Sequence, residues 1–110
     1  MEPWNLGTWN LGTWNREMVV GLLSVELHIP YAQSLKDKRM VLRGLKDRLK
    51  KFNVSVAEVE YQDVWQRAGL GVVTISTAQD HADRELQAVA AEIERLEPGL
   101  VSRTEIEFLT

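Results

Sequence analysis

The sequence predicts one α+β domain in which two helices cover one face of a four-stranded antiparallel sheet. Two observations support this fold class, and a third limits the kinds of site that the chain can contain. The chain has 110 residues, which is enough for one hydrophobic core and too few for two. Two segments show helical periodicity and four show strand patterns, in the order βαββαβ. The chain contains no cysteine, which excludes a disulfide framework and a thiolate metal site.

The first strand is expected between Met18 and Pro30, because apolar residues alternate there and proline ends the run. Odd positions should face the core, whereas Val20 and Leu22 should face outward. The first helix should begin after Ser34, a favourable N-cap residue, and run to about Lys51. Its core positions recur at helical spacing: Leu35, Leu42, Leu45, Leu49 and Phe52.

The remaining elements follow from composition and periodicity. Segments 53–61 and 70–77 are rich in β-branched residues and should form strands. A second helix follows, and Pro98-Gly99 ends it before a last strand at 101–109. Its expected core positions are Ala82, Leu86, Val89, Ile93 and Leu96.

This element order predicts a split βαβ, ferredoxin-like sandwich with strand order 4-1-3-2 and both helices on one face. In that topology the end of the first strand, the start of the first helix and the turn between the second and third strands lie at one end. Five residues should therefore gather near segment 62–67: His28, Tyr31, Ser34, Lys36 and Lys38.

Residues 1–17 form a low-complexity tail ahead of the domain at 18–110. The pentapeptide at 4–8, Trp-Asn-Leu-Gly-Thr, recurs at 9–13. A glycine in each copy weakens regular structure, so we expect no independent fold. The tail is either a tandem DNA repeat read through from upstream of a true start at Met18, or a tryptophan-bearing arm that docks on a partner.

The net charge of −3 conceals an asymmetry. Residues 36–51 contain eight of the thirteen Lys and Arg residues against two Asp, a local charge of +6 that leaves −9 for the rest. The chain contains no apolar run near the roughly 20 residues of a membrane span and no signal-peptide pattern at its start. We therefore expect a cytoplasmic protein.

Cations at the start of the first helix are unusual. Backbone N–H groups already make a helix N-terminus electropositive, so each cation there costs roughly 0.3–1 kcal/mol unless an anion binds. Four further cations form one stripe, with Lys36 nearby, that extends about 21 Å along the helix: Arg39, Arg43, Lys46 and Lys50. The stripe is either a phosphate-binding surface or a solvated face that balances the acidic remainder.

Segment 62–67 is longer than a minimal hairpin turn and contains Trp65. This side chain either plugs the end of the core or forms a stacking platform beside Arg67, with Gln62 and Gln66 as hydrogen-bonding groups. Asp63 either caps the turn or pairs with Arg67.

Several stretches resemble the YlxP-like family of small bacterial proteins over Met18 to about Leu109. They are Val25-Glu26-Leu27-His28-Ile29-Pro30, Ser34-Leu35-Lys36-Asp37-Lys38-Arg39, Phe52-Asn53-Val54-Ser55-Val56-Ala57-Glu58-Val59 and Gln62-Asp63-Val64-Trp65-Gln66-Arg67-Ala68. The resemblance implies a ferredoxin-like fold in a family of unknown function. Such proteins are often encoded beside translation-initiation and ribosome-binding factors, which implies a ribosome- or RNA-associated role.

We therefore expect a non-enzymatic protein, without metal or cofactor, that binds ribosomal RNA or a ribosomal subunit through phosphate contacts. The candidate residues are Ser34, Lys36, Lys38, Arg39, Arg43, Lys46, Lys50, Gln62, Trp65, Gln66 and Arg67. The sheet face is a poor RNA platform, because segment 70–76 has no aromatic residue and outward glutamates would repel phosphate. These are Glu26, Glu105 and Glu107.

Three alternatives remain open. A small phosphate-bearing ligand could bind at the N-terminus of the first helix without using the whole stripe. The domain could be an oligomeric or protein-interaction module that pairs through its sheet face or an edge strand. His28 near Asp63 and Ser34 could perform acid–base chemistry, although His28 and His81 match no zinc-site spacing.

Overall fold

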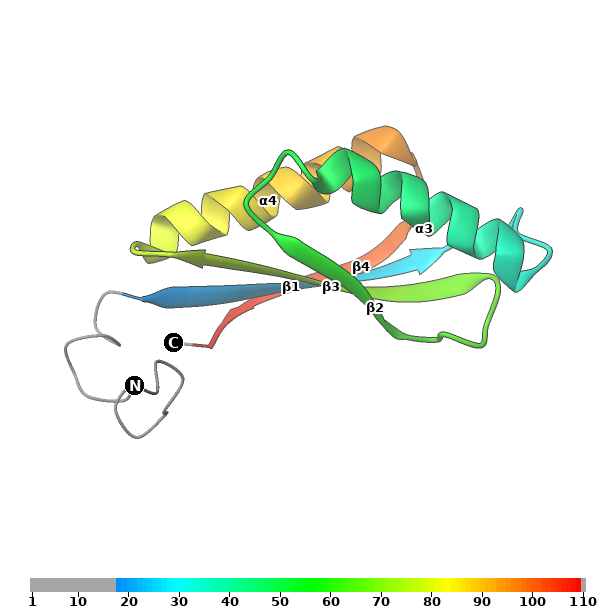
Figure 1. Cartoon of the computed structure of the whole chain (residues 1–110), viewed down its shortest axis with the longest axis horizontal. Coiled ribbons are helices and arrows are strands. Elements are labelled where there is room, and N and C mark those ends of the chain that lie inside the picture. Colours follow the sequence, from blue (N-terminus) through cyan, green and yellow to red (C-terminus); the bar gives the residue numbers. More distant parts are fainter. Residues whose placement is uncertain (1–17, 110) are drawn as a thin grey trace, which may run out of the picture.

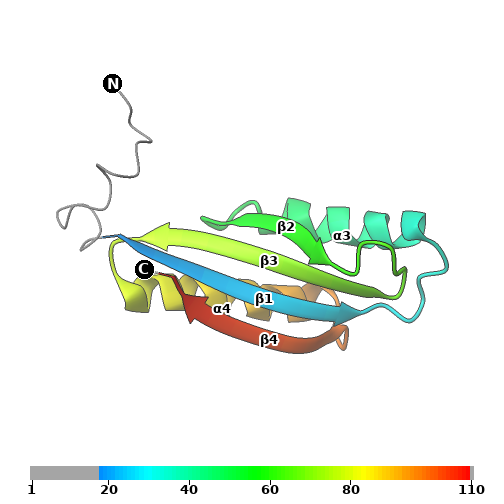
Figure 2. The ribbon, with the colours of Figure 1, turned by 90° about the horizontal axis from the view of Figure 1, so that it is seen from below.

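The computed structural model describes residues 18–109 as a four-stranded antiparallel sheet with two helices on one face (Figure 1). The elements are β1 (Val19–His28), α3 (Leu35–Leu49), β2 (Ser55–Glu60), β3 (Arg67–Ser76), α4 (Gln79–Leu96) and β4 (Val101–Phe108). The sheet order is β2-β3-β1-β4, so β2 and β4 form its edges (Figure 2). Counted from the β4 edge, the order is β4-β1-β3-β2. The tail expected at 1–17 lies outside the described residues.

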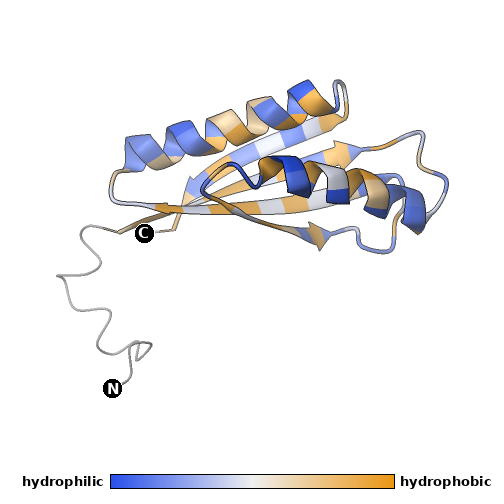
Figure 3. Cartoon of the chain, turned by 45° about the horizontal axis from the view of Figure 1, so that its top comes forward, coloured by the Kyte–Doolittle hydropathy of each residue, from blue (hydrophilic) through white to orange (hydrophobic). Residues whose placement is uncertain are grey.

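The hydrophobic core lies between the sheet and the helices, and the period-two pattern of β1 explains how it forms. Leu23, Val25, Leu27 and Ile29 are buried, which confirms that the odd positions face the core. Both helices alternate between hydrophilic and hydrophobic residues (Figure 3), as amphipathic helices do. The helices contribute Leu42, Leu45 and Leu49 of α3 and Ala82, Leu86, Val89 and Ile93 of α4 to this core.

The third strand begins three residues earlier than expected, at Arg67 instead of Leu70. Ala68 pairs with Leu27 of β1, and Gly69 pairs with Glu26. The pairing overrides the low strand propensity of alanine and glycine, on which the sequence-based boundary depended. Gly69 also lies opposite a bulge in β2, where an added Cβ would lie 2.7 Å from the Cβ of Glu60. Glycine is therefore required there by close approach of the strands.

Glu92 of α4 links this helix to Lys51, which follows the end of α3. Its Oε2 accepts hydrogen bonds from Lys51 Nζ at 3.1 Å and from Arg95 Nη2 at 2.7 Å. The hydrogen bond from Arg95, followed by that from Lys51, lowers the pKa of Glu92 from 4.5 to about 2. Because the folded pKa lies below the unfolded value, this contribution to stability is complete above the unfolded pKa and is lost as the pH falls through the folded pKa.

We expect Glu92→Gln to make the free energy of unfolding less dependent on pH between about 4.5 and about 2. Urea unfolding at a series of pH values measures this dependence. The exposed Glu94→Gln change on the same helix is the control. An acid dependence identical in the wild type and the Glu92→Gln variant would contradict the prediction.

Over residues 18–109, no helix is both long enough and apolar enough to cross a membrane. The same part of the chain contains no group of three or more His, Cys, Asp and Glu residues that could hold a metal ion.

Candidate nucleic-acid interface

The loop between β2 and β3 packs against the turn that precedes α3. The backbone N–H of Ile29 donates to the carbonyl of Gln66 at 2.9 Å. The side-chain amide of Gln66 donates to the carbonyls of Pro30 and Ala32 at 3.1 and 3.2 Å. The structure therefore brings together the segments that the topology was expected to unite. Gln66, a candidate ligand-binding residue, uses its amide N–H groups to hold this junction.

Lys38 lies at the centre of the junction, with 1% of its side chain exposed. Its ammonium donates to the carbonyls of Val64 at 2.6 Å, Tyr61 at 2.8 Å and Arg67 at 3.2 Å, with the Gln62 carbonyl at 3.4 Å. Glu58 Oε2 lies 2.8 Å away, outside hydrogen-bond geometry, and supplies the counter-charge. Lys38 thus ties α3 to the whole loop.

The assignment of Lys38 to the anion-binding surface is therefore wrong. All its donors are directed at acceptors within the protein, and an external phosphate would have to displace these carbonyls to reach the buried ammonium. Tyr61 helps to create this arrangement, because its backbone is in the left-handed region with φ of 61°. The same carbonyl accepts from both Lys38 and the N–H of Val64.

The start of α3 also has a structural explanation. The Ser34 hydroxyl accepts from the N–H of Asp37 at 3.0 Å, and Asp37 Oδ2 accepts from the N–H of Gln33 at 3.0 Å. This reciprocal cap satisfies N-terminal donors and places a carboxylate at the positive end of the helix. Because Asp37 lies at this terminus and Lys38 is buried, little unbalanced positive charge remains there to attract an anion. Ser34 serves as the helix cap.

Arg67 lies on the face of the sheet opposite the helices, since the next residue, Ala68, is buried beneath them. Its guanidinium donates to Glu26 Oε2 and, at 2.9 Å, to the hydroxyl of Tyr61. It also stacks 4.0 Å from the centroid of the Tyr61 ring. The hydrogen bond to Glu26 raises the pKa of Arg67. Arg67 is therefore separated from the cations of α3 and pairs with Glu26 instead of Asp63.

Three of the remaining cations of α3 line a groove of about 200 Å³ beside β2. Its lining residues are Arg39, Leu42, Arg43, Lys46 and Glu58. Within residues 18–109, Arg39, Arg43 and Lys46 make no ion pair. Glu58 is already neutralised by Lys38. We call Arg39, Arg43 and Lys46 the basic groove.

The two ends of the expected stripe differ from its centre. Lys36 is exposed at the start of α3. Lys50, the C-cap residue of the helix, pairs with Asp47 at 3.3 Å, with both side chains exposed. Such a pair is weak in water, so Lys50 can exchange Asp47 for another anion at little cost.

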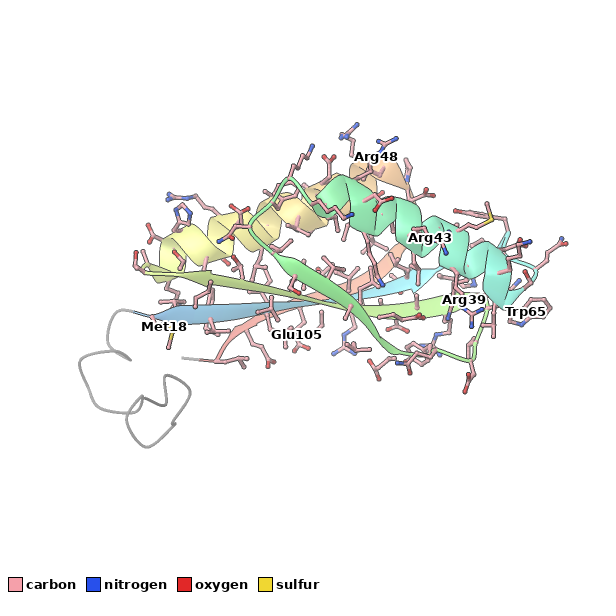
Figure 4. All side chains as sticks on the ribbon, viewed as in Figure 1. Met18, Arg39, Arg43, Arg48, Trp65 and Glu105 are labelled. Atoms are coloured by element: carbon pink, nitrogen blue, oxygen red, sulfur yellow. The ribbon has the colours of Figure 1, made fainter. Side chains whose placement is uncertain are left out.

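Trp65 is 48% exposed at the tip of the loop, so it does not plug the core. It lies at the same end of the molecule as Arg39, with Arg43 and Arg48 following along α3 (Figure 4). Val64 beside it is 40% exposed. Gln62 is also exposed, and its amide donates to the carbonyl of Glu58 at 3.4 Å. The loop thus presents an exposed tryptophan on a backbone held by Lys38.

Two residues of this region escaped sequence reasoning, Glu58 and Tyr61. The sequence contains a signal for Glu58, because it continues the alternation of inward residues that begins at Val54, just before β2, and includes Val56. A carboxylate at such a position needs a buried partner. Nothing in the sequence pointed to Tyr61, whose role depends on a positive φ and on a contact with Arg67.

The expected cluster around His28 is incomplete. His28 is exposed at the end of β1, and the hydroxyl of Tyr31 donates to Glu97 Oε1 at 2.9 Å. Burial, followed by this hydrogen bond and the charge of Glu97, raises the pKa of Tyr31 to about 12. Tyr31 therefore connects to the end of α4 and not to the loop.

Comparison with known proteins identifies the family to which this chain belongs. Residues 20–106 match the family described as "Protein of unknown function (DUF503)". The chain is 40% identical over 94 residues to "Uncharacterized protein YlxP" of Bacillus subtilis (strain 168), covering 79% of this chain and 98% of that protein.

Among solved structures, "De novo designed protein Foldit4" is similar with a TM-score of 0.54 and 14% identity, covering 86% of this chain and 98% of the other. SnoaB, a cofactor-independent oxygenase from Streptomyces nogalater, has a TM-score of 0.45 and 12% identity, covering 86% and 92%. The family match and the identity to the Bacillus subtilis protein, each over most of the chain, confirm the resemblance to YlxP-like proteins and show that the chain belongs to the DUF503 family.

Proposed function

We propose that this protein is a cytoplasmic, non-enzymatic, ribosome-associated RNA-binding protein, which contacts phosphates through α3. One observation carries the proposal: Arg39, Arg43 and Lys46 line one groove and have no ion pair within the described part of the chain. Three unpaired cations repel one another, and a polyanion offsets that repulsion.

The charges on the rest of the chain also favour binding of a polyanion at α3. The chain outside residues 36–51 carries −9, so a polyanion is attracted to α3 and repelled elsewhere. Glu58 does not cancel the basic groove, because its nearest cation is the buried Lys38. Lys36 and Lys50 extend the cationic surface beyond both ends of the groove.

Trp65 supplies a second kind of contact beside the phosphate-binding surface. An exposed tryptophan on an ordered loop offers a flat surface for an unpaired base, and stacking tolerates any base. The three carbonyls that accept from Lys38 within 3.2 Å hold the loop in place. We therefore expect single-stranded or looped RNA to be preferred to a regular duplex.

We further infer that the fold is of the ferredoxin-like class, because two helices cover one face of an antiparallel β2-β3-β1-β4 sheet. The alternative of a small phosphate-bearing ligand at the start of α3 is disfavoured. The Asp37 carboxylate lies there and accepts the N–H of Gln33.

The test is binding of the full chain to purified ribosomal subunits at about 50 mM and about 200 mM salt. We expect wild-type affinity to fall as salt rises. We expect Arg39→Glu/Arg43→Glu to weaken binding at least about tenfold at the lower salt, and to reduce the slope of log affinity against log salt by about 1.5.

The control is Arg48→Glu/Arg84→Glu, which changes the net charge equally. Arg48 lies on α3 beside α4, and Arg84 lies on α4. We expect this variant to retain affinity within about threefold, since neither residue belongs to the basic groove. Absence of wild-type binding at the lower salt would overturn the proposed function. Equal losses in the two variants would overturn the assignment of the groove.

A further inference from the structure

We propose that β4 is a self-association strand, which pairs antiparallel with β4 of a second copy about a two-fold axis at Thr104. The two sheets then join into one of eight strands. This inference concerns the edge of the sheet opposite the basic groove and does not depend on RNA binding.

The backbone of β4 is available for pairing. In the described structure β4 pairs with β1 alone, and residues 102–105 are all exposed. The N–H of Leu109 donates to the carbonyl of Val20, and Glu105 lies opposite Ser24. Since antiparallel strands alternate their bonding residues, Glu105 and Leu109 bond to β1, whereas Thr104 directs its N–H and carbonyl to the free edge. An exposed edge of this length readily accepts another strand.

The charges of β4 determine the register. A two-fold axis at Thr104 places Arg103 opposite Glu105 of the second copy, and the reverse pair forms symmetrically. These are non-hydrogen-bonded positions, where the Cβ atoms lie about 4.5–5.5 Å apart. Both side chains are largely exposed, 70% for Arg103 and 60% for Glu105. An axis at Arg103 or Glu105 would instead place like charges opposite each other.

Within one chain Arg103 Nη2 lies 3.9 Å from Glu105 Oε1. Pairing about Thr104 therefore creates a square of four alternating charges on the face away from the helices, where Figure 4 shows Glu105. The self-complementarity of this Arg-Thr-Glu sequence identifies the partner as a second copy.

The other edge strand is less suited to pairing. β2 has six residues and a bulge between Glu58 and Glu60. A bulge disrupts the pairing of an edge strand, and the cations of the basic groove beside this edge would repel the same cations of a second copy. The β4 edge has eight residues, and the basic groove does not lie beside it. Its pairing with β1 shifts register at Ser102, two residues before Thr104, so the pairing proposed here uses the regular part of the strand from Arg103 onward.

The proposed dimer has a defined geometry. A two-fold axis through an antiparallel pair is perpendicular to the sheet, so all four helices lie on one side. The two β2 strands become the outer edges, separated by seven strand spacings, or about 34 Å. The two basic grooves then face the same side from opposite edges.

Sedimentation velocity of the full chain over a range of concentrations tests this proposal. We expect a species of twice the 12.6 kDa chain mass. Arg103→Glu and Glu105→Arg should each raise the dimer dissociation constant at least about tenfold, because each places like charges opposite one another. The charge-swapped Arg103→Glu/Glu105→Arg variant should recover the wild-type constant within about threefold, since the pairs are restored with opposite polarity.

Two further variants distinguish a specific loss of the dimer from a loss of folding or a change in net charge. Thr104→Pro removes only an outward N–H, a position where edge strands tolerate proline, and should also dissociate the dimer. Arg84→Glu on α4 changes the net charge as Arg103→Glu does and should leave the dimer intact. A monomer at every concentration would overturn the proposal. So would a dimer indifferent to these β4 changes, which would indicate association through the exposed Val73 and Ile75 of the sheet face.

Discussion

Lys38→Ala is expected to lower the free energy of unfolding by about 3–5 kcal/mol, the range for removing one partner of a buried ion pair. The substitution leaves the carbonyls of Tyr61, Val64 and Arg67 without their shared donor. It also leaves Glu58 without its counter-charge. Few single substitutions have so large an effect, because few remove several buried contacts at once.

Urea unfolding followed by circular dichroism measures this loss. The control is Lys36→Ala on the same turn of α3, which is exposed and should change stability by less than about 0.5 kcal/mol. If Lys38→Ala does not fold, Lys38→Met retains the apolar stem and tests the loss of the ammonium alone. Equal stability of Lys38→Met and the wild type would contradict a structural role for this ammonium.

Trp65→Ala is expected to weaken RNA binding by about 5- to 150-fold, which corresponds to the 1–3 kcal/mol of one base stacked on an aromatic ring. This prediction depends on the proposed function. The salt dependence of binding should stay as in the wild type, because stacking releases no counterions. The Arg39→Glu/Arg43→Glu variant should do the reverse and reduce the salt slope. Titration of a short labelled single-stranded RNA at several salt concentrations separates the two kinds of contact.

Trp65→Phe and Val64→Ala are the matched variants for this experiment. Trp65→Phe keeps an aromatic ring and should retain most of the affinity. Val64→Ala removes apolar area from the adjacent exposed side chain and should have little effect. Because Trp65 is 48% exposed, we expect Trp65→Ala to alter stability by less than about 1 kcal/mol. Undiminished RNA affinity in Trp65→Ala would exclude the stacking role.

Lys38 shows how far the candidate site was predictable. Its position in the cationic first turn of the helix favours an anion site. The same position lies on the buried face, four residues before Leu42 and seven before Leu45. Glu58 likewise follows Val54 and Val56 at inward positions. Two opposite charges on inward faces indicate a buried pair, but only if both faces are known to meet.

The sequence by itself determined the elements, their buried faces and the concentration of positive charge on α3, because periodicity, capping and composition are local properties. It also indicated that segment 62–67 would meet the start of α3, because chain order limits the possible topologies. The tertiary structure alone decided which cations remain available to a ligand. The availability of each cation depends on which carbonyl and carboxylate groups from distant parts of the sequence lie next to it in the fold. Lys38 donates to carbonyls of the β2–β3 loop, and Arg67 pairs with Glu26. Arg39, Arg43 and Lys46 remain without an ion pair within the described residues.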